Sequence, residues 1–240
     1  MLNNFIYIMG NYFHTLSTYI INSYIVLVNF ISLFINKILR FPIYLFPYSN
    51  IKKLHATLID ARKALDNEKI PYMFAYGTAL GVHRNGDLIP WDDDIDLAIF
   101  YEDITDSNSI NSAMKKNDFL PRFPGKSDPF SWICEGEKYP VLFQYDHKKT
   151  GIGCDLYILY KHSGYVWEYS GGGEKHGKGH CFPIEPPEYV IFEEEKVKAF
   201  PESWLEACYG DWKIPRLGDK GGKNNIKVPN NQNTILPAPT

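Results

Sequence analysis

Several patterns that would assign a function class directly are absent from the sequence. The four cysteines are spread along the chain without a C-x-x-C pair, which excludes a zinc ribbon and a dense disulfide framework. No G-x-S-x-G, Walker A or G-x-G-x-x-G motif is present, which argues against a serine hydrolase, a P-loop enzyme and a dinucleotide-dependent oxidoreductase. The formal net charge of -3 provides no broad basic field, so a nucleic-acid partner is not expected.

The beginning of the chain lacks charge. No Lys, Arg, Asp or Glu occurs from Leu2 to Asn36, and the apolar run Tyr19–Asn36 approaches the ~20 residues of a bilayer span. There is no basic region or A-x-A site typical of a cleaved signal peptide. We therefore expect residues 1–48 to form a hydrophobic N-terminal segment that attaches the protein to a membrane, with amphipathic or interfacial helices as the alternative. Lys37 and Arg40 follow the segment, which favours a cytoplasmic position for the remaining chain.

The remainder of the chain has the pattern of one globular domain. Leu54, Leu58 and Leu65 recur at helical spacing and predict an amphipathic helix over Ile51–Lys69. A second, short helix is expected at Ser203–Tyr209. The strand candidates are the apolar runs Tyr72–Tyr76, Ile95–Tyr101, Val141–Tyr145 and Cys154–Tyr160. The order of these helices and strands predicts an α/β or α+β domain over residues 51–217, with one mixed sheet flanked by helices. A Gly-rich loop is expected within residues 163–179, and a loosely ordered tail over 218–240.

The densest chemical signal is the acidic run Trp91-Asp-Asp-Asp-Ile-Asp96. Side chains alternate along a strand, so Asp94 and Asp96 should point to the same face and Asp93 away from it. Carboxylates this close repel one another unless a divalent cation lies among them. Asp155, an acid in an otherwise apolar strand, is the candidate for a third ligand because an unpaired buried acid is costly. Oxygen ligands of this kind suit Mg²⁺, or Mn²⁺ in its place.

Two other interpretations of the acidic run were weighed. The first is a solvated acidic turn, which is what acidic clusters usually are. The second is a calcium loop, since Asp92, Asp94 and Asp96 have the D-x-D-x-D spacing. The sixth position of such a loop requires glycine, but it is Leu97 here, and the following residues have a strand pattern. We therefore reject the calcium loop.

The segment before the acids has the features of a phosphate-binding turn. Gly77 follows a predicted strand and permits close approach of the backbone to a phosphate, and the hydroxyl of Thr78 can add a contact at the start of a helix. Arg84 can pair two phosphate oxygens at once. The alternative for Arg84 is a surface ion pair with Asp87 or Asp92.

The remaining candidates are weaker. Trp91 can stack on a base, although packing against the domain is favoured. His176, His180 and Cys181 lie close in sequence but in a Gly-rich loop, which does not favour a zinc site. The other histidines, among them His55, His83 and His147, are expected to be ordinary polar residues.

The segment GTALGVHRNGDLIPWDDDID, from Gly77 to Asp96, resembles the signature of the LicD and fukutin family, in which G-T-L-L-G and an Arg precede I-P-W-D-D-D-I-D. Asp155, in GCDLYILY, occupies the place of the family's third acid. A later segment from Phe200 to Trp212 resembles the family's closing segment, so the resemblance covers roughly residues 51–216. His83 departs from the Val or Ala usual at its position.

The resemblance implies a nucleotidyltransferase fold and transfer of a phospho-alcohol, such as phosphocholine or ribitol phosphate, from a CDP-linked donor to a glycan hydroxyl. It implies metal ligation by Asp94, Asp96 and Asp155, a phosphate turn at Gly77 and Thr78, and a phosphate contact by Arg84. Eukaryotic relatives are anchored in the Golgi, so a Golgi or ER membrane location is expected beside the cytoplasmic alternative. Two other functions stay open: nucleotidyl transfer to another acceptor, and a catalytically silent binding module.

Overall fold

The computed structural model describes residues 50–122, 130–134, 137–162, 164–168 and 180–214. The chain divides into two compact units, and all described residues except Lys213 and Ile214 lie in the unit made of Pro47–Trp212 and Gly221–Thr240. The N-terminal membrane segment, the predicted tail and most of the predicted Gly-rich loop lie outside the described residues. None of the described helices is long and apolar enough to cross a membrane.

Four α-helices and one short 3-10 helix are described. They are α2 (Ile51–Asn67), α3 (Tyr76–Asn85), η1 (Tyr101–Asp103), α4 (Ser107–Lys116) and α5 (Glu202–Tyr209). The predicted helix at the start of the domain is therefore confirmed as α2, since its apolar residues at helical spacing are buried. The predicted C-terminal helix is confirmed as α5, one residue longer at its start.

The strands described form one mixed, 10-stranded sheet, whose main path runs in the order β3-β5-β6-β2-β1-β10-β9, with β4, β7 and β8 off this path. They are β1 (Met73–Phe74), β2 (Asp94–Phe100), β3 (Phe119–Pro121), β4 (Phe130–Cys134), β5 (Glu137–His147), β6 (Gly153–His162), β7 (Tyr165–Glu168), β8 (His180–Pro183), β9 (Glu188–Phe192) and β10 (Glu195–Ala199). Strands β2 and β6 are parallel, as are β1 and β10, and the other pairs are antiparallel. The mixed α/β architecture expected from the sequence is thus observed.

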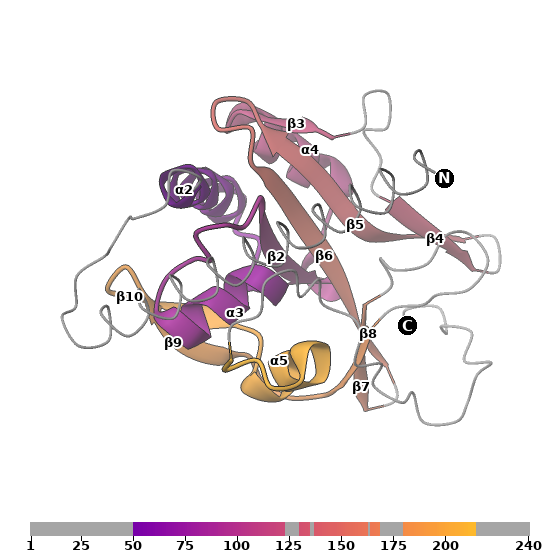
Figure 1. Ribbon diagram of the computed structural model, residues 1–240. Coiled ribbons are helices and arrows are strands. Elements are labelled where there is room, and N and C mark those ends of the chain that lie inside the picture. Colours follow the sequence, from indigo (N-terminus) through magenta and orange to yellow (C-terminus); the bar gives the residue numbers. More distant parts are fainter. Residues whose placement is uncertain (1–49, 123–129, 135–136, 163, 169–179, 215–240) are drawn as a thin grey trace, which may run out of the picture. The chain divides into compact units, whose positions relative to one another are not determined.

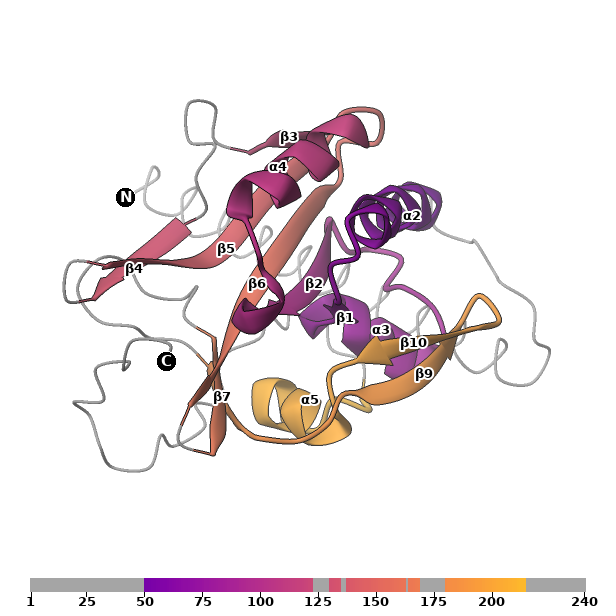
Figure 2. The same ribbon diagram turned by 180° about the vertical axis from the view of Figure 1, so that it is seen from behind.

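Helices cover both faces of the central strands (Figures 1 and 2). Helices α2 and α4 pack against each other on one face, whereas α3 lies on the other and contacts β2, β9 and α5. Because side chains alternate along β2, Ile95, Leu97 and Ile99 face one helical layer and Asp94 and Asp96 face the other. The apolar core extends over both faces of β2, and the acids lie on the face that α3 covers.

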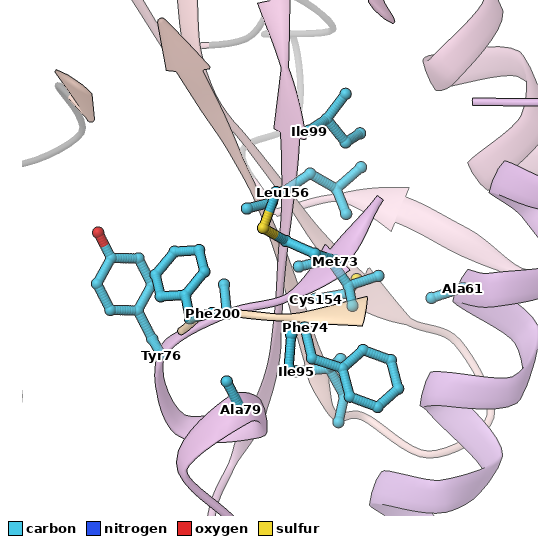
Figure 3. Packing of buried hydrophobic residues seen from close by; sticks show 14 of the residues in the cluster. Ala61, Met73, Phe74, Tyr76, Ala79, Ile95, Ile99, Cys154, Leu156 and Phe200 are labelled. Carbon is cyan, nitrogen blue, oxygen red and sulfur yellow. The ribbon is translucent and has the colours of Figure 1, made fainter. Parts of the chain in front are cut away.

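The apolar core is built from the strands in the middle of the sheet. Figure 3 shows side chains of β1, β2 and β6, such as Phe74, Ile95 and Leu156, between Ala61 of α2 and Ala79 of α3. Each of these five side chains is almost completely buried. Close packing on this scale fixes the backbone of β2 and β6 and hence the positions of the acids they carry.

The predicted strand Tyr72–Tyr76 is shorter in the structure, where only Met73–Phe74 pairs with neighbours. Tyr76 is instead the first residue of α3, with a φ of 37°. A tyrosine in the left-handed region is uncommon and costs about 1–3 kcal/mol. Its ring packs against Tyr157 and Phe200 and its hydroxyl donates to Glu168, 3.1 Å away. The turn from strand to helix is therefore held by buried contacts of its first helical residue.

Candidate active site

The three acids singled out in the sequence lie together on two parallel strands. Asp96 of β2 is directly opposite Asp155 of β6, and Asp94 is opposite Gly153. One carboxylate oxygen from each of Asp94, Asp96 and Asp155 lies within 4.8 Å of the other two. The structure thus brings together the residues predicted as metal ligands, while ligation itself stays a prediction.

Asp96 and Asp155 are buried and Asp94 is partly buried, and this burial disfavours the charged form of each. Asp96 is 6% exposed and Asp155 is 5% exposed. Burial, followed by the charge of Asp92, raises the pKa of Asp94 to about 7. Burial, followed by the charges of Asp94 and Asp92, raises the pKa of Asp96 well above its usual value. An acid cluster of this kind is stabilised in its ionised form only when a positive charge enters it.

Gly77 and Thr78, in the first turn of α3, both bond to Asp96. The backbone N–H of Gly77 donates to Asp96 Oδ2 at 2.8 Å, and the Thr78 hydroxyl accepts from the backbone N–H of Asp96 at 2.9 Å. A Cβ on residue 77 would lie 2.7 Å from Asp92 Oδ2 and 3.0 Å from Asp96 Oδ2. A side chain at position 77 would therefore displace one of these carboxylates. In this structure both residues hold Asp96, and their predicted contact with phosphate stays a prediction.

Asp155 has polar neighbours that the sequence did not suggest. The Gln144 side chain donates to Asp155 Oδ2 at 2.8 Å. Arg122 donates from Nε to Asp146 at 3.0 Å, and its Nη1 lies 3.5 Å from Asp155 Oδ1. No motif surrounds Arg122 or Gln144, because β3, β5 and β6 come together only through their antiparallel pairing. Arg122 is thus a cation placed at the edge of the acid cluster.

Glycine at position 153 makes room for that arginine. A Cβ there would lie 1.9 Å from Arg122 Nη2 and 3.1 Å from the Asp94 Cβ. Since backbone and guanidinium approach so closely, Gly153 and Arg122 act as a pair. Both were missed by the sequence analysis.

Arg84 lies in the last turn of α3, seven residues from Gly77. Its Nε is buried and has no hydrogen-bond partner, and burial lowers the pKa of the guanidinium. The alternative ion pair with Asp87 or Asp92 is not formed between these described residues, and Asp87 instead contacts His55. Arg84 does not touch the three acids directly. Its predicted role as a phosphate contact is untested.

Tyr209 of α5 is a further neighbour of this region. Burial is the main cause that raises the pKa of the Tyr209 phenol well above its usual value, and the charge of Asp96 is the second. The charge of the same phenol raises the pKa of Arg84, against the larger, opposite effect of burial. Tyr209 therefore lies near both the acid cluster and the arginine. In the sequence, Tyr209 stands out only as part of the segment that resembles the closing segment of the family.

The other residues of the acidic run take different positions. Burial raises the pKa of Asp92 to about 6, and its Oδ1 accepts from the Asp93 backbone N–H at 3.1 Å. Asp93 is exposed, and one of its oxygens lies within 4.8 Å of oxygens of Asp92 and Asp94. Trp91 packs against the core, in agreement with the favoured interpretation. The suggested cluster of His176, His180 and Cys181 includes side chains outside the described set.

The residues present fit a hard divalent cation. The donor set consists of carboxylate oxygens only, which suits Mg²⁺ or Mn²⁺ better than softer metals. Asp155 Oδ1 is buried and accepts no hydrogen bond, although the Arg122 charge is nearby. A buried carboxylate oxygen without a hydrogen-bond donor is costly unless a cation occupies its free direction. The cluster could thus bind such an ion.

Comparison with known proteins places this geometry in a family. The model described as LicD/FKTN/FKRP, nucleotidyltransferase domain, matches residues 69–201. The chain belongs to the LicD/FKTN/FKRP nucleotidyltransferase domain family. The matched segment contains α3, β2 and β6, and with them all three acids. The family expected from the sequence motif is therefore confirmed.

Individual relatives are more distant. The Homo sapiens and Macaca fascicularis proteins named "Ribitol-5-phosphate transferase FKTN" are each 27% identical over 162 residues, covering 65% of this chain and 32% of theirs. The Mus musculus "Ribitol 5-phosphate transferase FKRP" is 39% identical over 49 residues, covering 20% of this chain and 10% of its own. The chain thus spans about a third of the FKTN proteins it matches.

Among solved structures, ANT(2")-Ia in complex with adenylyl-2"-tobramycin has a TM-score of 0.37 and 14% identity, covering 62% of this chain and 70% of the other. The family match shows that the chain carries the nucleotidyltransferase domain of the LicD and fukutin family, and the FKTN relatives are distant members that share it.

Proposed function

We propose that this domain transfers a phospho-alcohol, of the phosphocholine or ribitol phosphate class, from a CDP-linked donor to a hydroxyl of a glycan. The observation that supports it is the convergence of Asp94, Asp96 and Asp155 from two parallel strands beside the first turn of α3. The FKTN and FKRP relatives are named as ribitol phosphate transferases, which favours ribitol phosphate as the first group to test.

The acids would hold Mg²⁺ or Mn²⁺, which when bound neutralises the charge of the donor phosphates and of the transition state. Asp96 would be the best fixed ligand, because Gly77 and Thr78 hold its carboxylate and its backbone at 2.8 and 2.9 Å. Gln144 fixes Asp155 in the same way from β5. Such prior positioning lowers the cost of assembling the site when the donor arrives.

Arg84 would bind a donor phosphate. It follows Gly77 by seven residues on one helix, so the two lie about 10 Å apart along the axis and on the same helical face. Long side chains on a helix point back toward its N-terminus, which is the end where the acids lie. Because its Nε is buried without a hydrogen-bond partner, a phosphate oxygen would satisfy a donor that otherwise carries a desolvation cost.

In the proposed reaction the acceptor hydroxyl oxygen forms a bond to the phosphorus that carries the alcohol. The bond from that phosphorus to the bridging oxygen breaks, and CMP leaves with that oxygen. The hydroxyl proton passes to a base, for which Asp92 and Asp93 are the candidates beside the cluster. The chain's own contribution is to place the acids, the arginine and the acceptor for in-line displacement.

The test is incubation of the purified chain with CDP-ribitol, CDP-choline and CDP-glycerol, with and without Mg²⁺, in the presence of candidate glycan acceptors. The proposal expects CMP to be released in a manner that depends on both metal and acceptor. Nucleotidyl transfer, the alternative that the family description keeps open, would instead release pyrophosphate from a nucleoside triphosphate. If neither CMP nor pyrophosphate is released but a thermal shift shows that the donor binds, the domain is a silent binding module.

Membrane attachment is proposed for the segment Tyr19–Asn36 on hydropathy. We favour a Golgi or ER membrane because the resemblance points to eukaryotic relatives of that kind, and the cytoplasmic alternative remains part of the test. The measurement is fractionation of the full-length protein followed by protease protection of the domain. Recovery of the full-length chain in the supernatant without detergent would contradict the proposal.

A further inference from the structure

A second group of potential ligands lies at the other end of α3. His83 of α3, Glu188 of β9 and Glu202 of α5 each offer one ligand atom, and these atoms lie within 4.8 Å of one another. The three elements that carry them are in contact in the fold (Figures 1 and 2). The group shares no residue with the acid cluster.

The hydrogen bond of His83 defines its tautomer. Nε2 lies 2.8 Å from the carbonyl oxygen of Phe200. A carbonyl oxygen only accepts, so Nε2 carries the proton and Nδ1 of the neutral ring carries the lone pair. In metal sites the ligating histidine almost always donates its other N–H to a backbone carbonyl, a carboxylate or water. His83 already has this arrangement.

The free nitrogen of His83 points to the carboxylates. Its side chain is only 4% exposed, and Nδ1 lies 4.0 Å from Glu188 Oε2. That distance is too long for a hydrogen bond, and Nδ1 has no other hydrogen bond within the described residues. The nitrogen that carries the lone pair, in a side chain more than nine-tenths buried, thus faces the carboxylate of Glu188, and a ligand atom of Glu202 completes the group.

His55 of α2, on the other face of the sheet, is also flanked by two acids, but it is hydrogen-bonded to both of them. The two ring nitrogens of His55 lie 2.6 Å from Asp87 and 2.6 Å from Glu193. Both nitrogens donate in the charged ring, so the two acids favour the protonated form. The hydrogen bond with Asp87 is the main cause that raises the pKa of His55. His83 makes no such short hydrogen bond to the described acids, and its Nδ1 lies 4.0 Å from Glu188. This separation leaves room for an ion between its ring and the acids.

Glu188 is held in place by a second contact. Its Oε1 accepts from the backbone N–H of Glu202 at 3.0 Å, at the start of α5, while its Oε2 faces His83. One carboxylate therefore connects the first turn of α5 to the last turn of α3. An ion bound here would join three segments that are distant in the sequence.

We propose that His83, Glu188 and Glu202 bind a transition-metal dication, with Zn²⁺ as the probe. A ligand set of one imidazole and two carboxylates suits Zn²⁺ and its neighbours, whereas Mg²⁺ and Ca²⁺ take oxygen ligands. The ion stabilises the packing of α3, β9 and α5 and leaves coordination positions for water. It is chemically distinct from the ion of the acid cluster.

The experiment measures Zn²⁺ binding by calorimetry and thermal shift on the full chain stripped of metal by chelator, in excess Mg²⁺ to occupy the oxygen-only site. The expected result is one Zn²⁺ bound per chain with a rise in Tm. Loss of a residue that only supports a metal ligand costs about 10–100-fold in metal affinity. His83 and Glu202 are themselves the proposed ligands, so His83→Gln and Glu202→Gln should each weaken Zn²⁺ binding by about tenfold or more.

His55→Gln is the matched control, since it removes a histidine that is also flanked by two acids. It and Asp155→Asn should leave the affinity for Zn²⁺ within about twofold. Glu202 is exposed, so Glu202→Gln keeps the test valid if the buried His83→Gln variant fails to fold. Unchanged Zn²⁺ affinity in Glu202→Gln, or an equal loss in His55→Gln, would overturn the proposal.

Discussion

The two ends of α3 carry groups of potential ligands with different energetic character. At the N-terminal end the acids are buried and crowded, and the pKa of Asp94 reaches about 7 because the charged form is disfavoured. At the C-terminal end only the His83 side chain is buried, and Glu188 remains 45% exposed. Residues that hold a destabilising arrangement are more often functional than structural. The comparison therefore supports the proposals that the first group carries the chemistry and that the second stabilises the packing of α3, β9 and α5.

The largest effect is expected from a change in the acid cluster at the N-terminal end of α3. Asp96→Asn should lower turnover about a hundredfold or more, since several kcal/mol of charge stabilisation depend on the bound ion. Folding should persist and the metal-free Tm should hold or rise, because one member of a repelling set is neutralised. CMP release and thermal melts of the variant measure both. Near-normal turnover would remove Asp96 from the site.

Gly77→Ala should follow closely. The added Cβ would meet Asp92 Oδ2 at 2.7 Å and Asp96 Oδ2 at 3.0 Å, so a carboxylate must move. We expect Mg²⁺ affinity to fall about tenfold or more, with Zn²⁺ affinity at the His83 group unchanged. Titration of each metal by thermal shift separates the two ends. A variant that binds Mg²⁺ normally would show that the position of these acids does not limit metal binding.

Arg84→Lys should weaken donor use more than conservation of charge suggests. A lysine provides no planar pair of donors for phosphate oxygens, and about tenfold in kcat/KM corresponds to one lost charge-assisted hydrogen bond. Arg84 is adjacent to His83 in sequence, so the same variant also tests whether the two ends are independent. Zn²⁺ affinity should stay constant. Unaltered kinetics would favour a packing role for the arginine.

The pH dependence should also differ between the ends. Folded-state pKa values of about 7 for Asp94 and about 6 for Asp92 exceed the unfolded values, so the metal-free fold binds more protons than the unfolded chain. Its stability should fall as the pH rises from about 4 through 7. Mg²⁺ affinity should rise over the same window because the ligands must lose their protons. Melting curves at several pH values with and without Mg²⁺ measure this, and a metal-free Tm that rises over the window would contradict it.

How much the sequence predicted follows the same division. The acids of β2 and β6 were found because a contiguous motif and an isolated acid in an apolar strand are local signals. The His83 group was not found, since its members are distant in sequence and meet only through the packing of α3, β9 and α5. The sequence around His83 has no ligand spacing and predicts an ordinary polar residue there.

The elements show a similar pattern. The helix α2 and the strands β2 and β6 have long buried faces, which the apolar periodicity reveals. Helix α4 was missed because its sequence, SNSINSAMKK, buries only Ile110, Ala113 and Met114. Strand β10, EKVKA, is rich in Glu and Lys and largely exposed, so its pairing with β1 and β9 decides its structure. Strand β9, EYVIF, was missed although its aromatic and β-branched residues favour a strand. Arg122 and Gln144 belong with these, since strand pairing alone brings them to Asp155.

The smallest effect is expected from removal of residues 1–47, and it tests whether both ends of α3 belong to one independent unit. The compact unit that holds both ligand groups begins at Pro47, and it is anchored at its start because the backbone N–H of Asn50 donates to the Pro90 carbonyl at 2.8 Å and Ile51 is 3% exposed. All ligands of both groups lie between these residues and Trp212. The truncated chain should therefore keep its Tm within about 4 °C, bind Mg²⁺ and Zn²⁺ as before, and release CMP at the rate of the full chain. If it is insoluble where the full-length protein is soluble without detergent, the N-terminal segment is part of the core and the membrane proposal is wrong.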